Sequence, residues 1–365
     1  MIFTLTFFAA FLASLLITVL IIATQHLHGH LSLDNQPGVQ KLHKNPVPRV
    51  GGVALVFGAV LGGLVLTSEA QWLWFLICLS ALPAFSFGLL EDITSRVGVK
   101  TRLLATICSG LIFSSLTGYQ ITKVDIPGID YMLSLWPLSL LFTAFAIGGI
   151  SNAINIIDGV NGLALGTSII ILSGFAIVAG RSGDMEIVGM CLVGVGALAG
   201  IFVLNFPKGS IFLGDAGAYS IGFILAVIAV ALPQRNPEVS PLIGLLALSY
   251  PVIETAVSVI RRMMRAGSHP GRPDRLHLHS LIYRSRARRL AVALGVQHLR
   301  NALTGLLLMA MPLISVTLMV IFYEDSSWIA VSVALVAVLY IAVYRRVALL
   351  PKLMMRFQRR ARMQF

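Results

Sequence analysis

Acidic and amide side chains gather at three places where long apolar segments begin or end, and their types suit a divalent cation and phosphate. Glu91-Asp92 follows one apolar run, and Gly214-Asp215 precedes another. Adjacent carboxylates bind metal or accept a proton. A carboxylate at a helix N-terminus can hold Mg²⁺ against a diphosphate, although Asp is also a common helix N-cap. Charge is costly near hydrocarbon, so charged groups at these positions indicate a functional site.

The third place is a ladder of polar residues at every third position, made of Asn152, Asn155, Asp158 and Asn161. Steps of three residues drift by about 60° on an α-helix, so the first three share one face. Gly159 and Gly162 then predict the end of the helix and a turn. Helix capping explains part of this pattern, but four such residues exceed what a cap requires.

Two basic segments accompany the acids. Lys41-Leu42-His43-Lys44 precedes a proline-rich stretch, and Arg272-Pro273-Asp274-Arg275-Leu276-His277-Leu278-His279 follows the pair Arg261-Arg262. A His-x-His pair without a third ligand nearby is weak evidence for zinc. Phosphate binding by two or three arginines with histidine is the sharper interpretation, and a solvated basic loop is the plainer one.

The elements that position these residues are membrane spans. Apolar residues make up 57% of the 365 residues and charged residues only 12%, which predicts an all-α polytopic membrane protein. Eleven spans in one bundle are expected, at about 1–24, 50–67, 71–89, 102–118, 133–150, 162–180, 186–206, 216–232, 241–260, 300–322 and 327–344. Residues 1–345 would form one membrane domain and 346–365 a basic cytoplasmic tail. The loop 119–131 is expected to form a small hairpin on the outside.

The basic residues give the orientation. Of 27 Lys and Arg residues, 24 fall in segments that this topology places inside, which leaves only Lys123, Arg181 and Arg235 outside. The first span carries no charge, so we expect a retained helix with its N-terminus outside and the C-terminus inside. The net charge of +12 then indicates affinity for anionic lipid and an anionic substrate, and not for nucleic acid.

In this order, the motifs resemble those of the polyprenyl-phosphate N-acetylhexosamine-1-phosphate transferases. The matching stretches are KLHKNPVPRVGG (41–52), GLLEDI (88–93), SNAINIIDGVNGLALG (151–166), FLGDAGAYSIG (212–222), PVIETAVSVIRR (251–262) and PDRLHLHS (273–280). They run from residue 41 to residue 280, a span of about two-thirds of the chain. The His-x-His loop and eleven spans look most like the branch that uses UDP-GlcNAc and undecaprenyl phosphate.

The resemblance implies a role for each matching residue. Asp215 and Asn155 are the implied metal ligands, while Glu91, Asp92 and Asp158 are the implied catalytic residues, with Asp92 as the base or the partner of the lipid phosphate. The implied contacts to nucleotide, diphosphate and sugar are Lys100, Asn152, Asn161, Arg272, Arg275, His277 and His279. Lys41 and His43 would support the lipid phosphate or the loop itself.

The implied reaction takes place at the cytoplasmic face of the bacterial inner membrane. Mg²⁺ (or Mn²⁺) binds the diphosphate of a UDP-N-acetylhexosamine, an oxygen of undecaprenyl phosphate attacks the β-phosphorus, and UMP leaves. Glu91 in place of the usual Asp, Asn161 in place of Asp and Ser280 after His279 depart from the family pattern. These departures leave open GlcNAc, GalNAc, QuiNAc or FucNAc as the sugar, and the sequence also leaves open a homodimer.

A transporter of anions or lipids is the rival interpretation from another class. Transporters place polar groups near the bilayer midplane on broken helices in repeated halves. Here the polar groups lie at the inner ends of spans and no repeat is visible, which favours the enzyme.

Overall fold

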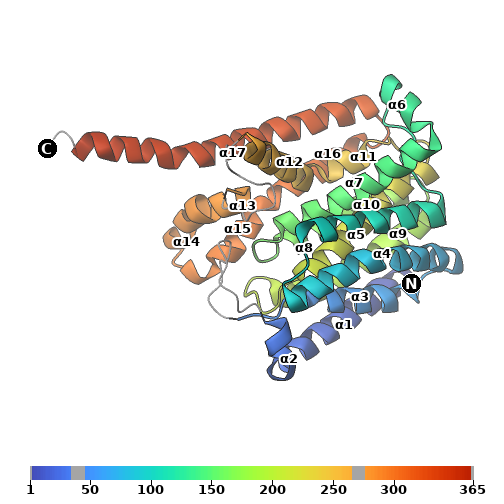
Figure 1. Cartoon of the computed structure of the whole chain (residues 1–365), viewed down its shortest axis with the longest axis horizontal. Coiled ribbons are helices and arrows are strands. Elements are labelled where there is room, and N and C mark those ends of the chain that lie inside the picture. Colours follow the sequence, from blue (N-terminus) through green and yellow to red (C-terminus); the bar gives the residue numbers. More distant parts are fainter. Residues whose placement is uncertain (1, 34–45, 265–275, 363–365) are drawn as a thin grey trace.

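Helices form all the regular structure in the described part of the chain (Figure 1). The computed structural model describes residues 2–33, 46–264 and 276–362, with side chains up to residue 348. Within them, nine helical segments are long and apolar enough to cross a membrane: α1 (Ile2–Ala23), α4 (Ser68–Thr94), α5 (Val99–Thr117), α7 (Trp136–Ile157), α8 (Leu163–Arg181), α9 (Met185–Asn205), α10 (Gly214–Arg235), Gln297–Phe322 and Ser326–Ala348. The expectation of an all-α polytopic membrane protein is confirmed.

Two further predicted spans are shorter than expected. The segment 50–67 contains α3 (Gly51–Gly63), and 241–260 is divided at Leu248 into α11 (Ile243–Ala247) and α12 (Ser249–Met263). The total of eleven therefore stays a prediction. The remaining elements are α2 (Gln25–Ser32), α6 (Pro127–Leu133), α13 (Leu278–Ile282), the π-helix η1 (Tyr283–Ala287), α14 (Arg288–Ala293), η2 (Gln297–Leu299), α15 (Arg300–Leu308), α16 (Ala310–Phe322) and α17 (Ser326–Arg362).

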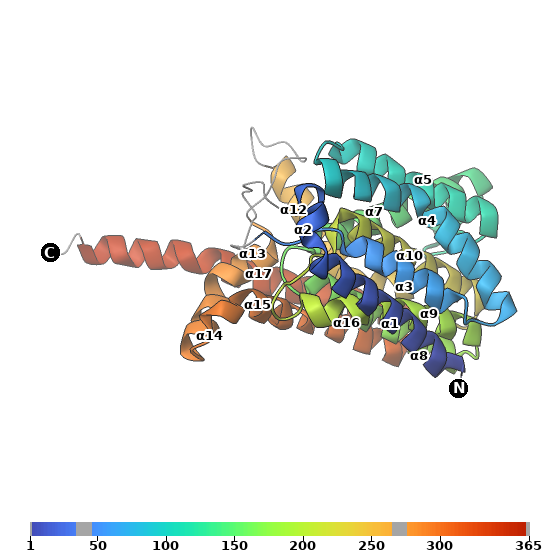
Figure 2. The ribbon, with the colours of Figure 1, turned by 90° about the horizontal axis from the view of Figure 1, so that it is seen from below.

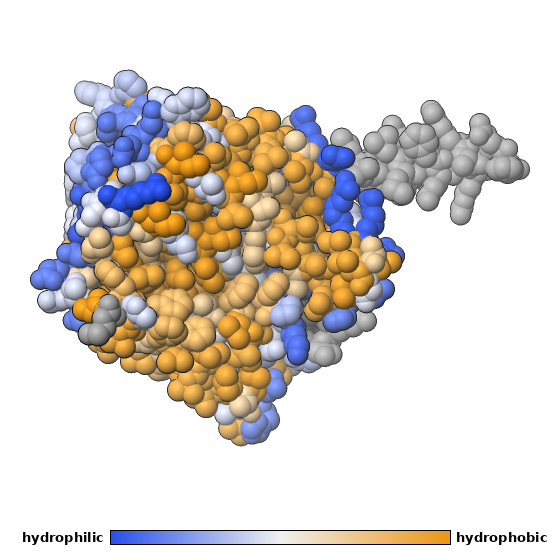
Figure 3. All heavy atoms as spheres, turned by 180° about the vertical axis from the view of Figure 1, so that it is seen from behind, coloured by the Kyte–Doolittle hydropathy of each residue, from blue (hydrophilic) through white to orange (hydrophobic). Residues whose placement is uncertain are grey.

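The surface of the bundle is apolar across a broad band (Figure 3). Hydrophilic residues gather at the two ends of this band, as expected of a protein whose middle faces lipid. We call the end where α4 finishes and α10 begins the site end, and the opposite one the far end. The chain starts at the far end, and α17 extends past the bundle at the site end (Figure 1).

Helix α10 occupies the centre, and nearly all of it is buried. On one side of the bundle, α1, α3 and α9 pack closely because small residues line their contacts (Figure 2). A Cβ at Gly196 of α9 would collide with the carbonyl oxygen of Phe7, and one at Gly200 would lie 2.7 Å from the backbone nitrogen of Leu15. Ser14 donates a hydrogen bond across this contact to the Ala197 carbonyl (2.7 Å). Small-xxx-small packing of this kind lets membrane helices approach closely.

A network of charged residues ties the helices together at the far end. Arg235, at the end of α10, binds Asp184 (2.6 Å) and Glu186 (2.9 Å) at the start of α9. Asp184 also caps α9 by accepting from the backbone nitrogen of Ile187 (3.1 Å). Burial alone would raise the pKa of Asp184, but the hydrogen bonds from Arg235 and Ile187 hold it below its ordinary value.

The expectation of a hairpin at 119–131 is wrong. The segment contains no strand, and α6 begins at Pro127. Its backbone groups bind one side chain of α7 and one of its own: Ile121 N donates to Thr143 Oγ1 (2.8 Å), and Val124 N donates to Asp130 Oδ1 (2.7 Å). These bonds take the place of a strand pairing, and the proline at the first helical position favours α6.

The basic residues near the C-terminus continue the last helix. Helix α17 runs without a break from Ser326 to Arg362, well past Ala348 where its apolar part ends. The division at residue 345 therefore falls within a continuous helix. The assignment of residues 346–365 as a cytoplasmic tail stays a prediction.

Candidate active site

The segment before α3 pairs with the segment before α10 through backbone hydrogen bonds. These bonds run from Phe212 N to Pro48 O (2.9 Å), from Gly51 N to Phe212 O (3.0 Å) and from Gly52 N to Leu213 O (2.8 Å). At the crossing, Gly214 has a positive φ of 75°, and a Cβ there would collide with the carbonyl oxygen of Arg49 and lie 2.6 Å from Asp92 Oδ2. Glycine is therefore required at this position for both backbone conformation and space.

Helix α4 brings Asp92 to the N-terminus of α10. One turn earlier, Gly88 allows the close approach, because a Cβ there would lie 2.6 Å from the Cα of Ala216. Asp92, only 4% exposed, then accepts hydrogen bonds from Asp215 N on Oδ1 (2.9 Å) and from Ala216 N on Oδ2 (2.9 Å). The first N–H groups of a helix have no partner within it, and a carboxylate satisfies them and opposes the helix dipole. Asp92 is thus a cap that one helix supplies to another.

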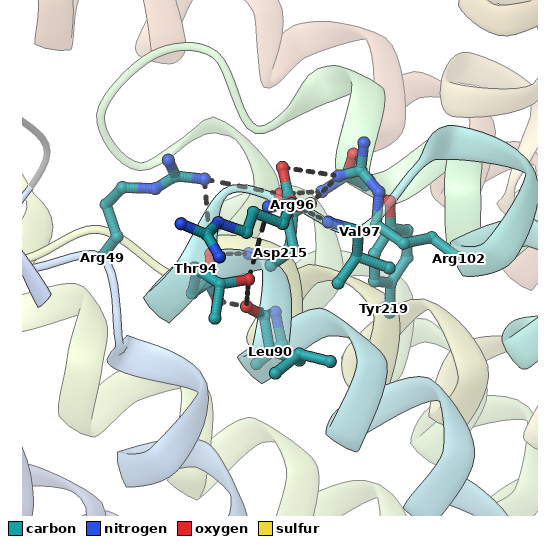
Figure 4. A network of polar contacts seen from close by, with 12 residues as sticks. Arg49, Leu90, Thr94, Arg96, Val97, Arg102, Asp215 and Tyr219 are labelled. Atoms are coloured by element: carbon teal, nitrogen blue, oxygen red, sulfur yellow. Dashed lines mark hydrogen bonds and ion pairs between the residues drawn. The ribbon is translucent and has the colours of Figure 1, made fainter. Parts of the chain in front are cut away.

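The neighbouring Asp215 carboxylate lies in a group of polar side chains that includes Arg49 and Arg102 (Figure 4). Its Oδ1 accepts from Asn155 Nδ2 at 2.9 Å, and its Oδ2 pairs with Arg102. Arg49 Nη2 lies 3.4 Å from Asp92 Oδ1 and 3.9 Å from Asp215 Oδ1, so it bridges the two acids. Asp92, Asn155 and Asp215, which come from three helices, therefore meet at one place.

Glu91 supports the same cluster from the last turn of α4. Its Oε2 accepts from Val97 N (2.8 Å), which closes the turn after the helix, and its Oε1 lies 3.9 Å from Arg102 Nη1. Figure 4 shows this turn beside Arg102, with Thr94 accepting from Arg96 N. Glu91 therefore contacts the same arginine as Asp215.

The polar ladder of α7 ends in the predicted turn. The helix stops at Ile157, and Gly162 has a positive φ of 77°. Asn161 N donates to Asn301 Oδ1 of α15 (2.8 Å), while Asn161 Nδ2 donates to Pro207 O (3.0 Å). Asn161 is 7% exposed, and these two bonds tie it to α15 and to the segment before α10. Its predicted contact with a nucleotide stays a prediction.

Asp158 lies outside the spans, at the start of that turn. Burial, with the negative charge of Asp215 added to it, raises the pKa of Asp158 from 3.8 to about 7, although Arg49 acts in the opposite direction. Its carboxylate therefore lies within electrostatic range of Asp215 and Arg49. Asp158 is thus coupled to the cluster through charge.

The His-x-His segment lies against this turn. A Cβ at Gly159 would collide with Nε2 of His279, so the imidazole ring packs directly on the residue after Asp158. The rings of His277 and His279 stack, with centroids 5.4 Å apart and planes 5° apart. The structure thus places the His-x-His segment against the turn that follows Asp158, although the two are more than 100 residues apart in the sequence.

The remaining predicted site residues lie apart or outside the described residues. Lys100 is exposed in the first turn of α5, and Asn152 ties α7 to Thr106 of α5 (3.0 Å). Lys41, His43, Arg272 and Arg275 lie outside the described residues.

Sequence reasoning missed Arg49, Arg102 and Tyr219 as site residues. Arg49 was visible only as one basic residue in a proline-rich loop, and Arg102 only as one of three near 96–102. Tyr219, one turn after Asp215 on α10, reaches Asn155 Oδ1 at 3.5 Å. Arg102 lies in the first turn of an apolar span, and a charged residue at such a position could have marked it as a candidate site residue.

The donor set is compatible with a divalent cation. Among the residues that the structure describes, no three His, Cys, Asp or Glu side chains form a preformed metal cluster. Mg²⁺ commonly needs only one or two carboxylates, because substrate phosphates and water complete its shell. If ionised, the four carboxylates of Glu91, Asp92, Asp158 and Asp215 face the two guanidinium groups of Arg49 and Arg102. The excess of two negative charges favours a divalent cation.

The chain is similar in sequence to known proteins. The family model described as glycosyl transferase family 4 matches residues 73–233. A Bacillus subtilis protein, named a probable undecaprenyl-phosphate N-acetylglucosaminyl 1-phosphate transferase, is 30% identical over 273 residues, which cover 74% of this chain and 75% of that protein. The chain belongs to glycosyl transferase family 4. The predicted resemblance is therefore confirmed.

Enterobacterial members of glycosyl transferase family 4 are also similar. Proteins of Yersinia pestis and Escherichia coli K12, each named undecaprenyl-phosphate alpha-N-acetylglucosaminyl 1-phosphate transferase, are 26% identical, and each match covers 70% of this chain and 70% of the relative. Together with the apolar helices, these relatives identify an integral membrane transferase of this family.

Gly214→Ala is expected to abolish transferase activity, with at least about a hundredfold loss, since its Cβ would push the Arg49 backbone and Asp92 away from α10. Gly149→Ala on α7 is the matched control, because a Cβ there has nothing within 4 Å. The measurement is specific activity at equal amounts of folded protein. Full activity of Gly214→Ala would contradict the described junction.

Asp158→Asn is expected to stabilise the protein more at pH 8 than at pH 5. The pKa of Asp158 is raised to about 7 in the folded state, so the folded protein holds this proton at pH values where the unfolded chain has released it. The free energy of unfolding therefore falls as pH rises from about 4 to 7. Asparagine cannot ionise and escapes this loss. Thermal unfolding in detergent with a chelator measures the difference, with Glu69→Gln at the far end as a control for charge removal. An equal difference at both pH values would refute the raised pKa.

Proposed function

We propose that the protein transfers N-acetylglucosamine-1-phosphate from UDP-N-acetylglucosamine to undecaprenyl phosphate and releases UMP. The observation that carries the proposal is the meeting of Asp92, Asn155 and Asp215 with two arginines at one end of a membrane bundle. The names of the relatives suggest the acceptor lipid and the sugar phosphate. The product would start the synthesis of a cell-envelope glycan such as O-antigen or capsule.

In the proposed reaction, an oxygen of the lipid phosphate forms a bond to the β-phosphorus of the UDP-sugar. The bond from that phosphorus to the bridging oxygen breaks, and UMP leaves with the bridging oxygen. Phosphoryl transfer depends mainly on positioning and on neutralising charge. The second pKa of a phosphate monoester is near 6, so the attacking oxygen is already ionised at neutral pH. The reaction therefore needs no strong base.

The hydrogen bonds of Asp92 support a positioning role. Both of its carboxylate oxygens accept from backbone amides of α10. Taking a proton from the acceptor would disturb the cap that fixes Asp215. We therefore favour Asp92 as the residue that positions Asp215, in place of the base that the resemblance implied.

Arg49 and Arg102 are the proposed diphosphate-binding groups. Each pairs with Asp215 in the structure, and each is partly exposed, with 27% and 16% of its side chain accessible. Arginine binds phosphate through a fixed fork of donors, so both can exchange a carboxylate for the diphosphate. The exchange would place cationic charge where the leaving UMP gains negative charge.

Mg²⁺ is the proposed cofactor, with Mn²⁺ as the alternative. Asp215, Asn155 and Asp158 are the residues that would hold it, since they carry oxygen donors and lie in the cluster with excess negative charge. When bound, the cation would supply charge neutralisation at the diphosphate. His277 and His279, packed on the turn after Asp158, are proposed to contact the donor substrate.

An apolar groove supports a polyprenyl acceptor. It has a volume of about 560 Å³ and lies among α7, α10, α11 and α12, where Ala146, Ile150, Leu245 and Val252 line it. The lining runs from Gln120 and Pro237 at the far end to Ile150 and Val252, two residues before Asn152 and Glu254, so the groove extends from the far end toward the middle of the bundle. A polyprenyl phosphate with its phosphate at the site end would extend its long chain along the bundle into this groove.

The proposed location is the bacterial inner membrane, with the site end facing the cytoplasm. The excess of Lys and Arg in the segments at that end supports this orientation, and nucleotide sugars are supplied from the cytoplasm. The N-terminus would then be periplasmic and the C-terminus cytoplasmic.

Purified protein is expected to release UMP from UDP-N-acetylglucosamine only when undecaprenyl phosphate and Mg²⁺ are both present. Asp215→Asn should reduce the rate at least about a hundredfold, because it removes charge from the proposed cation site. Glu69→Gln, which removes a carboxylate from α4 at the far end, should retain the wild-type rate. Full turnover by Asp215→Asn, or turnover in a chelator, would refute the cation assignment. Parallel assays with UDP-GalNAc, UDP-QuiNAc and UDP-FucNAc identify the sugar.

Ala146→Trp is expected to raise the KM for undecaprenyl phosphate by about tenfold, since the indole ring would fill part of the groove. A short acceptor such as geranyl phosphate should be much less affected, because its chain does not need the whole groove. Leu141→Trp is the matched control, since Leu141 is on the same helix, is 59% exposed and lies outside the groove. An unchanged KM in Ala146→Trp would exclude the groove as the lipid site.

A further inference from the structure

Glu254 is a buried carboxylate at the meeting point of three elements. It belongs to α12 and is 1% exposed. Its Oε1 accepts from His277 Nδ1 (3.1 Å) and from Leu278 N (3.0 Å), and its Oε2 accepts from Tyr340 OH of α17 (2.8 Å). Burying a carboxylate is costly unless it is fully hydrogen-bonded, and Glu254 meets this condition by binding the His-x-His segment.

The bond to His277 defines the chemistry of the imidazole ring. Nδ1 carries the proton that it donates to Glu254, so Nε2 is the acceptor in neutral His277 and a second donor in its cationic form. The bond to Leu278 N fixes the backbone at the first residue of α13. Glu254 thus fixes both the ring and the backbone from which the ring projects.

From His277 the contact continues to the acidic cluster. The His277 ring stacks on His279, whose own ring packs on Gly159, directly after Asp158. Arg261, two turns after Glu254 on α12, adds support by donating to the Leu276 carbonyl (2.8 Å). A continuous packed path therefore leads from Glu254 to the Asp158 turn.

We infer that Glu254 is a positioning residue that acts through His277 and His279 to hold the donor-binding segment against the Asp158 turn. The inference rests on the proposed function for the identity of the donor substrate. A purely structural tie between α12 and α17 is the competing explanation. The two explanations differ in whether the effect of Glu254 passes through His277.

The test compares Glu254→Gln with Tyr340→Phe. Glutamine keeps the shape of the side chain but removes its charge and one acceptor, whereas Tyr340→Phe removes a hydrogen bond to the same carboxylate and leaves its bonds to His277 and Leu278. Glu254→Gln is expected to lower kcat/KM for the UDP-sugar by about tenfold, mainly through KM. Tyr340→Phe should stay within about twofold of wild type even if both variants lose similar thermal stability.

A double-mutant cycle identifies the path. In a His277→Ala background, Glu254→Gln should change kcat/KM by less than about twofold further, because the group through which it acts is gone. A full additional tenfold loss would overturn the inference.

Hydrogen exchange gives a readout that does not need turnover. In the detergent-solubilised protein, Glu254→Gln should speed amide exchange in peptides covering both 276–283 and 156–163, whereas Tyr340→Phe should leave 156–163 unchanged. Unchanged exchange of 156–163 in Glu254→Gln would refute the inference. Absence of UMP release by the wild-type protein would instead refute the proposed function, and the exchange result would still decide the role of Glu254.

Discussion

Two hydrogen bonds from the first turn of α10 to the carboxylate of Asp92 define the geometry of the whole site. They satisfy amides that no intrahelical partner can reach, and they place a negative charge at the positive end of the helix dipole. Because one of these amides belongs to Asp215, the bond fixes the backbone from which the second carboxylate projects. Gly88 and Gly214 make the contact possible by removing the Cβ atoms that would separate α4 from α10.

The charge balance of the cluster follows from this contact. The carboxylates of Glu91, Asp92 and Asp215 meet Arg49 and Arg102 at one end of the bundle, and burial together with the charge of Asp215 raises the pKa of Asp158 in the adjoining turn. Such an arrangement is unfavourable for the resting protein, but it suits a cation that arrives with an anionic substrate. The arginines pair with Asp215 in the structure and provide the positive charge that a diphosphate would need.

Much of this organisation could be predicted from the sequence. Apolar runs predicted the spans, and Asp92, Asn155, Asp158 and Asp215 were singled out because polar and charged groups are costly near hydrocarbon. The contacts of Arg49 and Arg102 with Asp215 could not be predicted, since the paired residues are more than 100 positions apart in the sequence. Asn161 shows the same difficulty, because the partner of its backbone nitrogen is Asn301 on a distant helix.

The wrong expectation has a local cause. Alternating residues around Pro127-Gly128 suggested a hairpin, but Thr143 and Asp130 satisfy the backbone of that segment and a helix begins at the proline. The partners of Glu254 could not be predicted either, because nothing in the sequence indicates that α12 faces both His277 and Tyr340. Side-chain partners of buried polar groups are set by helix packing, which periodicity alone does not describe.

The central claim is that Asp92 caps α10 from a different helix and thereby positions Asp215. Hydrogen exchange at the backbone amide of Ala216, followed by NMR in protein labelled with ¹⁵N-alanine, measures this cap directly. In Asp92→Ala the account predicts exchange of this amide to be faster by about tenfold or more, with alanine amides in the middle of α10 unchanged. An Ala216 amide that stays equally protected after the loss of Asp92 would contradict it.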